Sequence, residues 1–208
     1  MPLAMNDNTL TETQLGSEIV LHGRFLHVQR DLVQLPDGNQ ATREYIVHPG
    51  AVMVIAQTDD GCFVMERQYR YPVQRVMIEF PAGKLDLGES GLDCAQRELL
   101  EETGFTAREW ARAGVLHPVI SYSTEFIEVW FARSLTAGPQ KLDAGEFIEV
   151  FTANIDGLLA WCAEGLVTDA KTLSGLLWLQ NVLSGRWVLD WQNQPGLRSN
   201  QSDQTLTG

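Results

Sequence analysis

Three glutamates near the middle of the chain have a spacing that suits binding of a divalent metal ion. Glu98, Glu101 and Glu102 stand at positions i, i+3 and i+4. In a helix, which turns about 100° per residue, such positions share one face. Like charges at this spacing destabilise a helix, and the local positive charge is Arg97. Because Mg²⁺ and Mn²⁺ prefer carboxylate oxygens, the pattern predicts a metal-binding face, with a solvated acidic face as the alternative.

The segment around these glutamates carries signals for both ends of a helix. Ser90 suits an N-cap position with Asp93 three residues later, and Gly104 suits the C-terminal end. A glycine-rich loop over residues 83–91 leads into the segment. We expect a helix with one face of carboxylates and another that packs into the core through Leu92, Ala95 and Leu99.

The composition restricts the classes of partner. The 208 residues include 15 Lys and Arg against 27 Asp and Glu, for a formal net charge of -12. A chain this acidic repels polyphosphate surfaces, so we expect no nucleic-acid partner. If the protein acts on phosphates, it is expected to recruit a divalent cation that reverses the local charge.

The cysteines and the hydropathy pattern point to a cytoplasmic protein. Cys62, Cys94 and Cys162 are far apart and form no CxxC motif, which disfavours a disulfide framework and a zinc site. We expect three buried thiols in a reducing compartment. No apolar run reaches the roughly 18 residues of a membrane span, and the N-terminus lacks a secretion-signal pattern. We therefore expect no membrane partner.

The chain divides into two structured parts between two tails. Residues 1–17 and 192–208 are polar and irregular, and we expect both to be disordered tails. Strand-like residues over 18–35 and 40–48, with Asp37-Gly38 between them, predict a hairpin. Pro49-Gly50 then interrupts the chain. We expect a small N-terminal β lobe over 18–48 and a main domain over 49–191.

The main domain mixes strands and helices, which predicts an α+β fold. Two helices are expected after the central one, and the second carries a leucine stripe at positions 173, 176, 179 and 183 that should face the core. Strands are expected over residues 51–56, 63–69, 113–120, 126–132 and 146–152, and the two later helices over residues 155–164 and 170–184.

The central segment carries glycines and charged residues at a specific spacing. Gly83 is followed after five residues by Glu89, and after seven more by Arg97-Glu98-Leu99-x-Glu101-Glu102-x-Gly104-Phe105. This spacing matches every fixed position of the Nudix box, so the chain resembles Nudix hydrolases, which cleave nucleoside diphosphates linked to another moiety. The resemblance implies an α/β/α sandwich around a mixed sheet, with the box forming a loop, a helix and a second loop.

Three segments around the box carry further information, namely Glu66-Arg-Gln-Tyr-Arg70, Glu79-Phe-Pro-Ala-Gly-Lys84 and Gly165-Leu-Val-Thr-Asp-Ala-Lys-Thr172. They resemble the ADP-ribose pyrophosphatase branch of this family. The resemblance implies a homodimer in which the N-terminal lobe is exchanged between subunits. It also implies hydrolysis of ADP-ribose to AMP and ribose 5-phosphate with Mg²⁺, or Mn²⁺, as the cofactor.

The same resemblance implies roles for residues of the box. Ala82 offers its backbone carbonyl to the metal, Glu98 and Glu102 bind metal directly, and Glu101 assists. An ion pair between Glu89 and Arg97 braces the loop against the helix.

Residues outside the box are implicated in substrate binding and in proton transfer. Arg70 is expected to hold a phosphate, with Arg43 as a weaker candidate, and Glu125 matches a glutamate downstream of the box. Glu146 is the expected general base and Asp143 the second candidate, on a late loop. For Arg70 and Glu146, a purely solvated side chain is the alternative.

The substrate is left open between several nucleotide sugars. The branch often carries Pro-Ser-Pro-Gly before the downstream glutamate, where this chain has Ile120 and Ser121 in place of the second proline and the glycine. GDP-mannose or another nucleotide sugar is therefore an alternative substrate. A non-catalytic ADP-ribose sensor is an alternative of a different class. Such proteins have usually lost carboxylates of the box, whereas this chain retains all of them.

Overall fold

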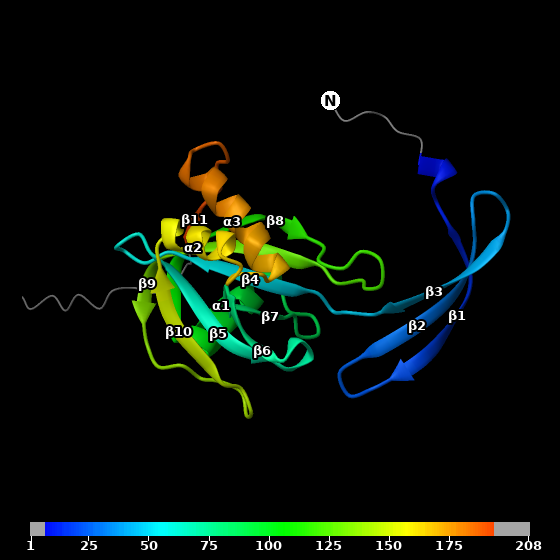
Figure 1. Cartoon of the computed structure of the whole chain (residues 1–208), viewed down its shortest axis with the longest axis horizontal. Coiled ribbons are helices and arrows are strands. Elements are labelled where there is room, and N and C mark those ends of the chain that lie inside the picture. The colour runs from blue at the N-terminus through cyan, green and yellow to red at the C-terminus, as the bar shows by residue number, and fades with distance from the viewer. Residues whose placement is uncertain (1–6, 194–208) are drawn as a thin grey trace, which may run out of the picture.

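A three-stranded antiparallel sheet stands beside a larger main domain in the computed structural model, which describes residues 7–193 (Figure 1). This lobe contains β1 (Thr13–His22), β2 (His27–Gln34) and β3 (Gln40–Ile46), in that order across the sheet, after a short 3-10 helix at Asp7–Thr9. The predicted hairpin between β2 and β3 is confirmed. Gly38 takes a φ of 87°, and the Asp37 side chain accepts a hydrogen bond of 3.0 Å from the backbone nitrogen of Asn39.

The start of the lobe differs from the prediction. Strand β1 begins at Thr13, inside the segment expected to be an irregular tail, and the stretch over 18–35 forms two strands rather than one. The polar residues of β1 are held by cross-strand partners, since Gln14 donates to Asp31 at 2.9 Å and Arg30 donates to Glu18 at 3.0 Å. At the other end, β11 (Gln192–Asn193) begins the second expected tail, and the rest of that tail lies outside the described residues.

Two sheets form the main domain. One is mixed and has the order β11-β8-β9-β4-β7, in which β4 and β9 are parallel and the other neighbours antiparallel. The other is antiparallel with the order β10-β5-β6. Their strands are β4 (Ala51–Ala56), β5 (Phe63–Arg70), β6 (Arg75–Glu79), β7 (Ala82–Lys84), β8 (Phe105–Leu116), β9 (Ile127–Ala137) and β10 (Ile148–Ala153).

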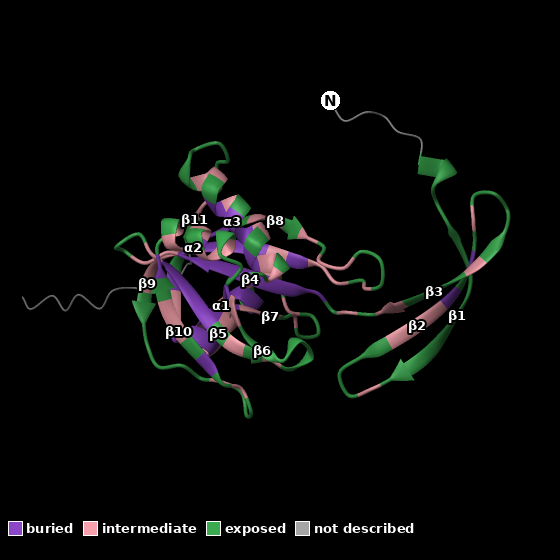
Figure 2. Ribbon diagram, viewed as in Figure 1, coloured by how far each residue is buried: buried purple, intermediate pink, exposed green. Residues whose placement is uncertain are grey.

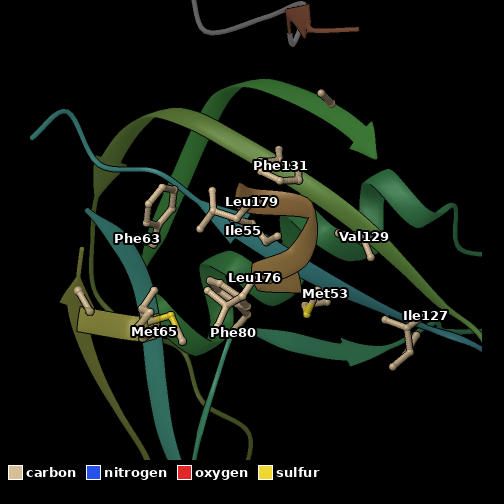
Figure 3. Close-up of a cluster of buried hydrophobic side chains, with 14 residues drawn as sticks. Met53, Ile55, Phe63, Met65, Phe80, Ile127, Val129, Phe131, Leu176 and Leu179 are labelled. Carbon is tan, nitrogen blue, oxygen red and sulfur yellow. The ribbon is translucent and has the colours of Figure 1, made fainter. Parts of the chain in front are cut away.

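Helices cover both faces of β4, which is buried along its whole length. On one face Val52 and Val54 pack with Leu99 of α1 (Gly91–Thr103). On the other face Met53 and Ile55 pack in a cluster that includes side chains of α2 (Ile155–Ala163) and α3 (Ala170–Leu183), shown in Figure 3. This layering confirms the expected α/β/α sandwich around a mixed sheet.

Several local predictions in the main domain were wrong. Strands β6 and β7 were not foreseen, and β8 covers Phe105–Leu116 rather than residues 113–120. A bulge between Arg112 and Gly114 interrupts the alternation of β8, so its two halves do not form one regular pattern in the sequence. Leu173 and Leu183 are 41% and 49% exposed, so only the middle of the expected stripe on α3 faces the core.

Of the three thiols only that of Cys94 is fully buried, and all three cysteines are free. Within residues 7–193, no helix has the length and apolar character needed to cross a membrane.

Few contacts join the lobe to the main domain. The backbone nitrogen of Ile46 donates to Tyr122 at 2.9 Å, and a bridge pairs Ile46 with Ser123 in the loop between β8 and β9. The Lys84 ammonium lies 4.0 Å from the centre of the Phe25 ring. Figure 2 shows that the surface of the lobe is mostly exposed, in contrast to the buried strands of the main domain.

Candidate active site

The ends of helix α1 are fixed by the residues expected to cap it. The Ser90 hydroxyl accepts a hydrogen bond of 3.2 Å from the backbone nitrogen of Asp93. Gly104 has a φ of 75°, and its backbone nitrogen donates to Leu100 at 2.9 Å. A Cβ at Gly104 would lie 2.2 Å from the carbonyl oxygen of Gly138, so this position requires glycine. The helix and both of its caps are therefore confirmed.

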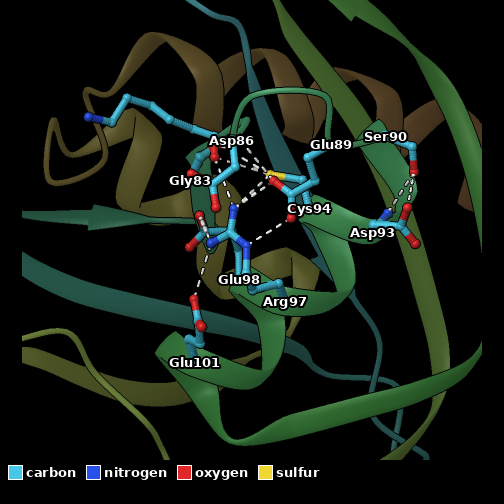
Figure 4. A network of polar contacts seen from close by, with 10 residues as sticks. Gly83, Asp86, Glu89, Ser90, Asp93, Cys94, Arg97, Glu98 and Glu101 are labelled. Carbon is cyan, nitrogen blue, oxygen red and sulfur yellow. Dashed lines mark hydrogen bonds and ion pairs between the residues drawn. The ribbon is translucent and has the colours of Figure 1, made fainter.

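Arg97 connects the glycine-rich loop to the carboxylates of α1, as Figure 4 shows. Its Nε and Nη2 atoms donate to the two carboxylate oxygens of Glu89 at 2.9 and 2.8 Å, which confirms the expected ion pair. Its Nη1 atom also donates to Glu98 at 2.7 Å and to Glu101 at 3.1 Å, which the sequence did not predict. Hydrogen bonds from Arg97 lower the pKa of Glu89 to about 2.

Glu102 lies against the backbone of the loop that precedes the helix. It is 5% exposed, and its Oε2 atom accepts a hydrogen bond of 2.9 Å from the backbone nitrogen of Ala82. Burial, reinforced by the negative charge of Glu98, raises its pKa to about 8. A Cβ at Gly83 would lie 1.9 Å from a carboxylate oxygen of Glu98, so glycine lets the helix approach the loop. Ala82, Glu98 and Glu102 are thus brought together.

Glu66, which was not predicted as a site residue, faces the same region from strand β5. It is 0% exposed, and neither carboxylate oxygen meets a hydrogen-bond donor among the described residues. Burial and then the charge of Glu102 raise its pKa well above the usual value. The available sequence signal was a glutamate directly after the apolar run 63–65.

A second cluster of charges holds Arg70. Its Nε and Nη2 atoms donate to Glu79 at 2.7 and 2.9 Å, and Nη1 is not part of this pair. Glu79 is 2% exposed and also contacts the Lys171 ammonium, which donates to Asp169 at 2.9 Å. Burial alone would raise the pKa of Glu79, but the two cations outweigh it and lower that pKa. Arg70 is therefore held in a fixed orientation.

Glu146 lies near the box carboxylates. It is half-buried in the connection between β9 and β10, and its charge adds to the effect of burial in raising the pKa values of Glu98 and Glu102. Asp143 is exposed, and its backbone nitrogen donates to the Glu146 carboxylate at 3.3 Å. An open depression of about 470 Å³ is lined by Glu146 and by Tyr69, among others. Of the two candidate bases, Glu146 has the position closer to the box.

Two expected substrate-binding residues interact with groups other than the carboxylates of α1. Glu125 is half-buried in the loop between β8 and β9, where its charge acts on His48. Arg43 is in the lobe, on β3, and its Nε atom donates to Glu12 at 3.0 Å. Within one chain, Arg43 is not brought to the carboxylates of α1.

The donor atoms around Glu102 fit a hard divalent cation. Buried carboxylates from α1 and β5 face each other here, and those of Glu66 lack donors. Cations that prefer oxygen ligands satisfy such groups, whereas an unpaired buried charge is costly. Among residues 7–193, no group of three acidic, histidine or cysteine side chains forms a ready-made set of metal ligands. Glu98 and Glu101 accept hydrogen bonds from Arg97. Binding of a cation would therefore require these side chains to exchange partners.

Comparisons with known proteins agree with this geometry. A family model described as NUDIX domain matches residues 47–170, and one described as nucleoside diphosphate sugar hydrolase N-terminal domain matches residues 12–46. An ADP-ribose pyrophosphatase of Bacillus subtilis (strain 168) is 36% identical over 174 residues, which are 83% of this chain and 94% of that protein. A methanol dehydrogenase activator of Bacillus methanolicus is 36% identical over 173 residues, 81% of this chain and 92% of that protein.

A solved structure, described as a crystal structure of an ADP compounds hydrolase, shares the fold. It has a TM-score of 0.76 at 24% identity and covers 84% of this chain and 95% of its own. The box geometry, the family match over most of the main domain and the N-terminal match over the lobe all lead to one assignment. The chain belongs to the Nudix hydrolase family and resembles its ADP-ribose pyrophosphatase branch.

Proposed function

We propose that the protein hydrolyses the pyrophosphate bond of a nucleoside diphosphate sugar, and that the substrate is ADP-ribose, cleaved to AMP and ribose 5-phosphate. The observation that carries the proposal is the packing of Glu98 and Glu102 against the Ala82-Gly83 backbone. This arrangement places buried carboxylates beside a backbone carbonyl in a family that acts on such bonds. A relative named as an ADP-ribose pyrophosphatase matches most of the chain.

The chain supplies a binding site for Mg²⁺, with Mn²⁺ as a substitute. Glu98, Glu102 and the carbonyl of Ala82 would hold the ion, and Glu101 would assist. A bound divalent ion neutralises phosphate charge and acidifies water. Arg97 and Glu89 fix the loop and the helix relative to each other through their paired hydrogen bonds.

Arg70 is proposed to orient a phosphate of the substrate. Its two hydrogen bonds to Glu79 occupy one edge of the guanidinium and leave Nη1 outside the pair. Because Lys171 also contacts Glu79, the carboxylate is held from two sides and the arginine pays little further entropy on binding. Glu146 is proposed to accept the proton of the attacking water, and Glu125 to contact the substrate from its loop.

We also propose that the lobe makes the protein a homodimer. Apolar side chains of β1 are exposed, with Ile19 at 65% and Leu21 at 48%, on a strand whose residues are all exposed. A three-stranded sheet with so little buried surface is not stable alone, so it needs a partner surface. In such a dimer, Arg43 would reach the active site of the second copy.

The cellular setting is proposed to be the cytoplasm, without nucleic-acid or membrane partners. The three free cysteines suit a reducing compartment, and the net charge of -12 disfavours polyanionic surfaces. We propose that the lobe predicted over residues 18–48, whose first strand begins at Thr13, is the dimerisation unit, and that residues 49–191 form the hydrolase domain.

GDP-mannose or another nucleotide sugar remains the alternative substrate, since Ile120 and Ser121 depart from the pattern of the branch. Hydrolysis of a panel of nucleotide sugars with Mg²⁺, followed by product identification, tests the proposal. We expect AMP and ribose 5-phosphate from ADP-ribose at the highest kcat/KM. If GDP-mannose is cleaved preferentially, it is the substrate in place of ADP-ribose. If ADP-ribose binds tightly but is not cleaved, the protein is a sensor.

A further inference from the structure

Glu66 is a fully buried carboxyl group beside the buried carboxyl group of Glu102. It is 0% exposed, and both of its oxygens lack a hydrogen-bond donor among residues 7–193. An unpaired carboxylate in a protein interior is destabilising, because water no longer solvates it. The roles described above for the box residues, Arg70 and Glu146 do not use this side chain.

The side chain of Glu66 points toward helix α1. Alternate residues of a strand share one face, so Val64, Glu66 and Gln68 point in the same direction. Val64 packs in the buried cluster that contains Ala95 and Leu99 of α1. The Oε1 atom of Gln68 is also buried without a donor among the described residues. This face of β5 therefore presents a short row of unsatisfied oxygen atoms to the helix that carries Glu102.

The nearby positive charges are already bonded elsewhere. Arg70 donates both of its short hydrogen bonds to Glu79, and Lys171 donates to Glu79 and Asp169. Both cations act on Glu66 only through space, and the negative charge of Glu102 has the larger effect on its pKa. A further cation that approached Glu66 and Glu102 together would pair with both carboxyl groups.

We propose that Glu66 is an additional carboxylate of the metal centre and contributes to binding of the divalent cation beside Glu102. The inference rests on the metal dependence in the proposed function, but it concerns a residue on β5, outside the box. It explains why two acidic side chains from different elements are buried next to each other. It also gives the unsatisfied oxygens of Glu66 a chemically suitable partner.

Titration of the metal-depleted protein with Mn²⁺ alone, followed by calorimetry or by the EPR signal of the free ion, tests this proposal. We expect Glu66→Gln to weaken Mn²⁺ binding by about 10- to 100-fold, the range seen when groups around a metal centre are removed. Glu149→Gln is the matched control. Glu149 lies on the neighbouring strand β10 and is exposed, and its loss removes the same charge from the same sheet. It should change Mn²⁺ affinity by less than about twofold.

Thermal unfolding separates a metal-binding carboxylate from one that is merely buried. Without metal, Glu66→Gln and Glu66→Met should both raise Tm, because each removes a carboxyl group whose ionisation is opposed by burial. Both should also reduce the increase in Tm that Mn²⁺ produces, and Glu66→Asp should restore part of that increase. A higher Tm with unchanged Mn²⁺ affinity in both variants would overturn the proposal.

Failure of this inference is distinguishable from failure of the proposed function. If the wild-type protein cleaves a nucleotide sugar but the Glu66 variants bind Mn²⁺ normally, only the role of Glu66 is wrong. If no nucleotide sugar is cleaved but Mn²⁺ affinity depends on Glu66, the metal centre stands and the substrate assignment falls.

Discussion

The Oε2 atom of Glu102 accepts a hydrogen bond of 2.9 Å from the backbone nitrogen of Ala82. This contact fixes the last turn of helix α1 to strand β7, 20 residues earlier in the chain. The carbonyl group of Ala82 is proposed to bind the metal ion, and so is the carboxylate of Glu102. The hydrogen bond therefore links the positions of two proposed metal ligands.

Glu102→Gln should abolish most of the activity while the fold is retained. The amide oxygen of glutamine can still accept from Ala82, so no cavity and no unpaired backbone group results. The negative charge is lost, which weakens binding of the metal ion. Initial rates at limiting Mg²⁺, with circular dichroism as the control for folding, measure this. Near wild-type turnover at limiting Mg²⁺ would contradict the metal-binding role.

The stability of the metal-free protein should fall as the pH rises from about 5 to 8. The pKa of Glu102 is about 8 in the folded protein, whereas the ordinary value of 4.5 applies in the unfolded protein. Between these two pH values the folded state binds more protons than the unfolded state. The slope of stability against pH is then negative. Melting temperatures measured with a chelator check this, and Glu102→Gln should flatten the slope. A slope that is the same in both proteins would show that other groups cause it.

Glu79→Gln should destabilise the protein far more than Glu149→Gln, although both remove the partner of an arginine on β5. Glu79 is 2% exposed and contacts Arg70 and Lys171, and loss of a buried partner typically costs about 3–5 kcal/mol. The pair of Glu149 with Arg67 is exposed and is worth less than about 1 kcal/mol. Denaturant unfolding measures both.

Substrate kinetics then test whether the Glu79 cluster also positions Arg70. In Glu79→Gln, KM should rise more than kcat falls, because Arg70 is no longer oriented before the substrate binds. Equal unfolding free energies for the two variants would show that the buried cluster does not stabilise the fold. An unchanged KM in Glu79→Gln would show that the cluster does not orient Arg70 for the substrate.

The parts of the fold that local residues determine could be predicted, and helix α1 is the clearest case. Ser90 and Gly104 act within one turn of the helix ends, so their types alone indicate its limits. Strand β1 was missed because its polar residues become ordered only through partners on β2, such as Asp31 for Gln14. Its β structure depends on long-range pairing that local propensity does not report.

The candidate site shows the same division between local and long-range information. The pairing of Glu89 with Arg97 follows from a loop and a helix adjacent in sequence. The contact of Lys171 with Glu79 spans 92 residues, and Glu66 on strand β5 meets Glu102 on helix α1. Arg43 was expected to be a substrate-binding residue, but only an arrangement of two chains could bring it to the box, and one sequence does not specify that arrangement.

Ile19→Asp should dissociate the proposed dimer. A charge in place of an exposed apolar side chain on β1 would have to be buried at the interface, which is unfavourable. Sedimentation at micromolar concentration should show a dimer for the wild type and a monomer for the variant. Leu173→Asp is the control, since Leu173 is also exposed but lies on α3 of the main domain. A stable, active wild-type monomer would rule out the dimer.

The assignment of the general base depends on how Glu146 and Asp143 differ in their surroundings. Glu146 is half-buried and acts electrostatically on Glu98 and Glu102, whereas Asp143 is exposed and contributes a backbone hydrogen bond to the Glu146 carboxylate. The two variants Glu146→Gln and Asp143→Asn therefore form a matched pair on one turn of the chain.

Glu146→Gln should lower kcat by about 10²- to 10⁴-fold and leave substrate Kd nearly unchanged at saturating Mg²⁺, because a general base acts only in the transition state. Asp143→Asn should have a small effect, since its backbone nitrogen still donates to Glu146. Loss of a metal-binding carboxylate would differ, because it would also weaken substrate binding through the ion. A severe effect of Asp143→Asn alone would transfer the role to Asp143. If neither change is severe, the water is activated by the metal alone or by another carboxylate such as Glu125.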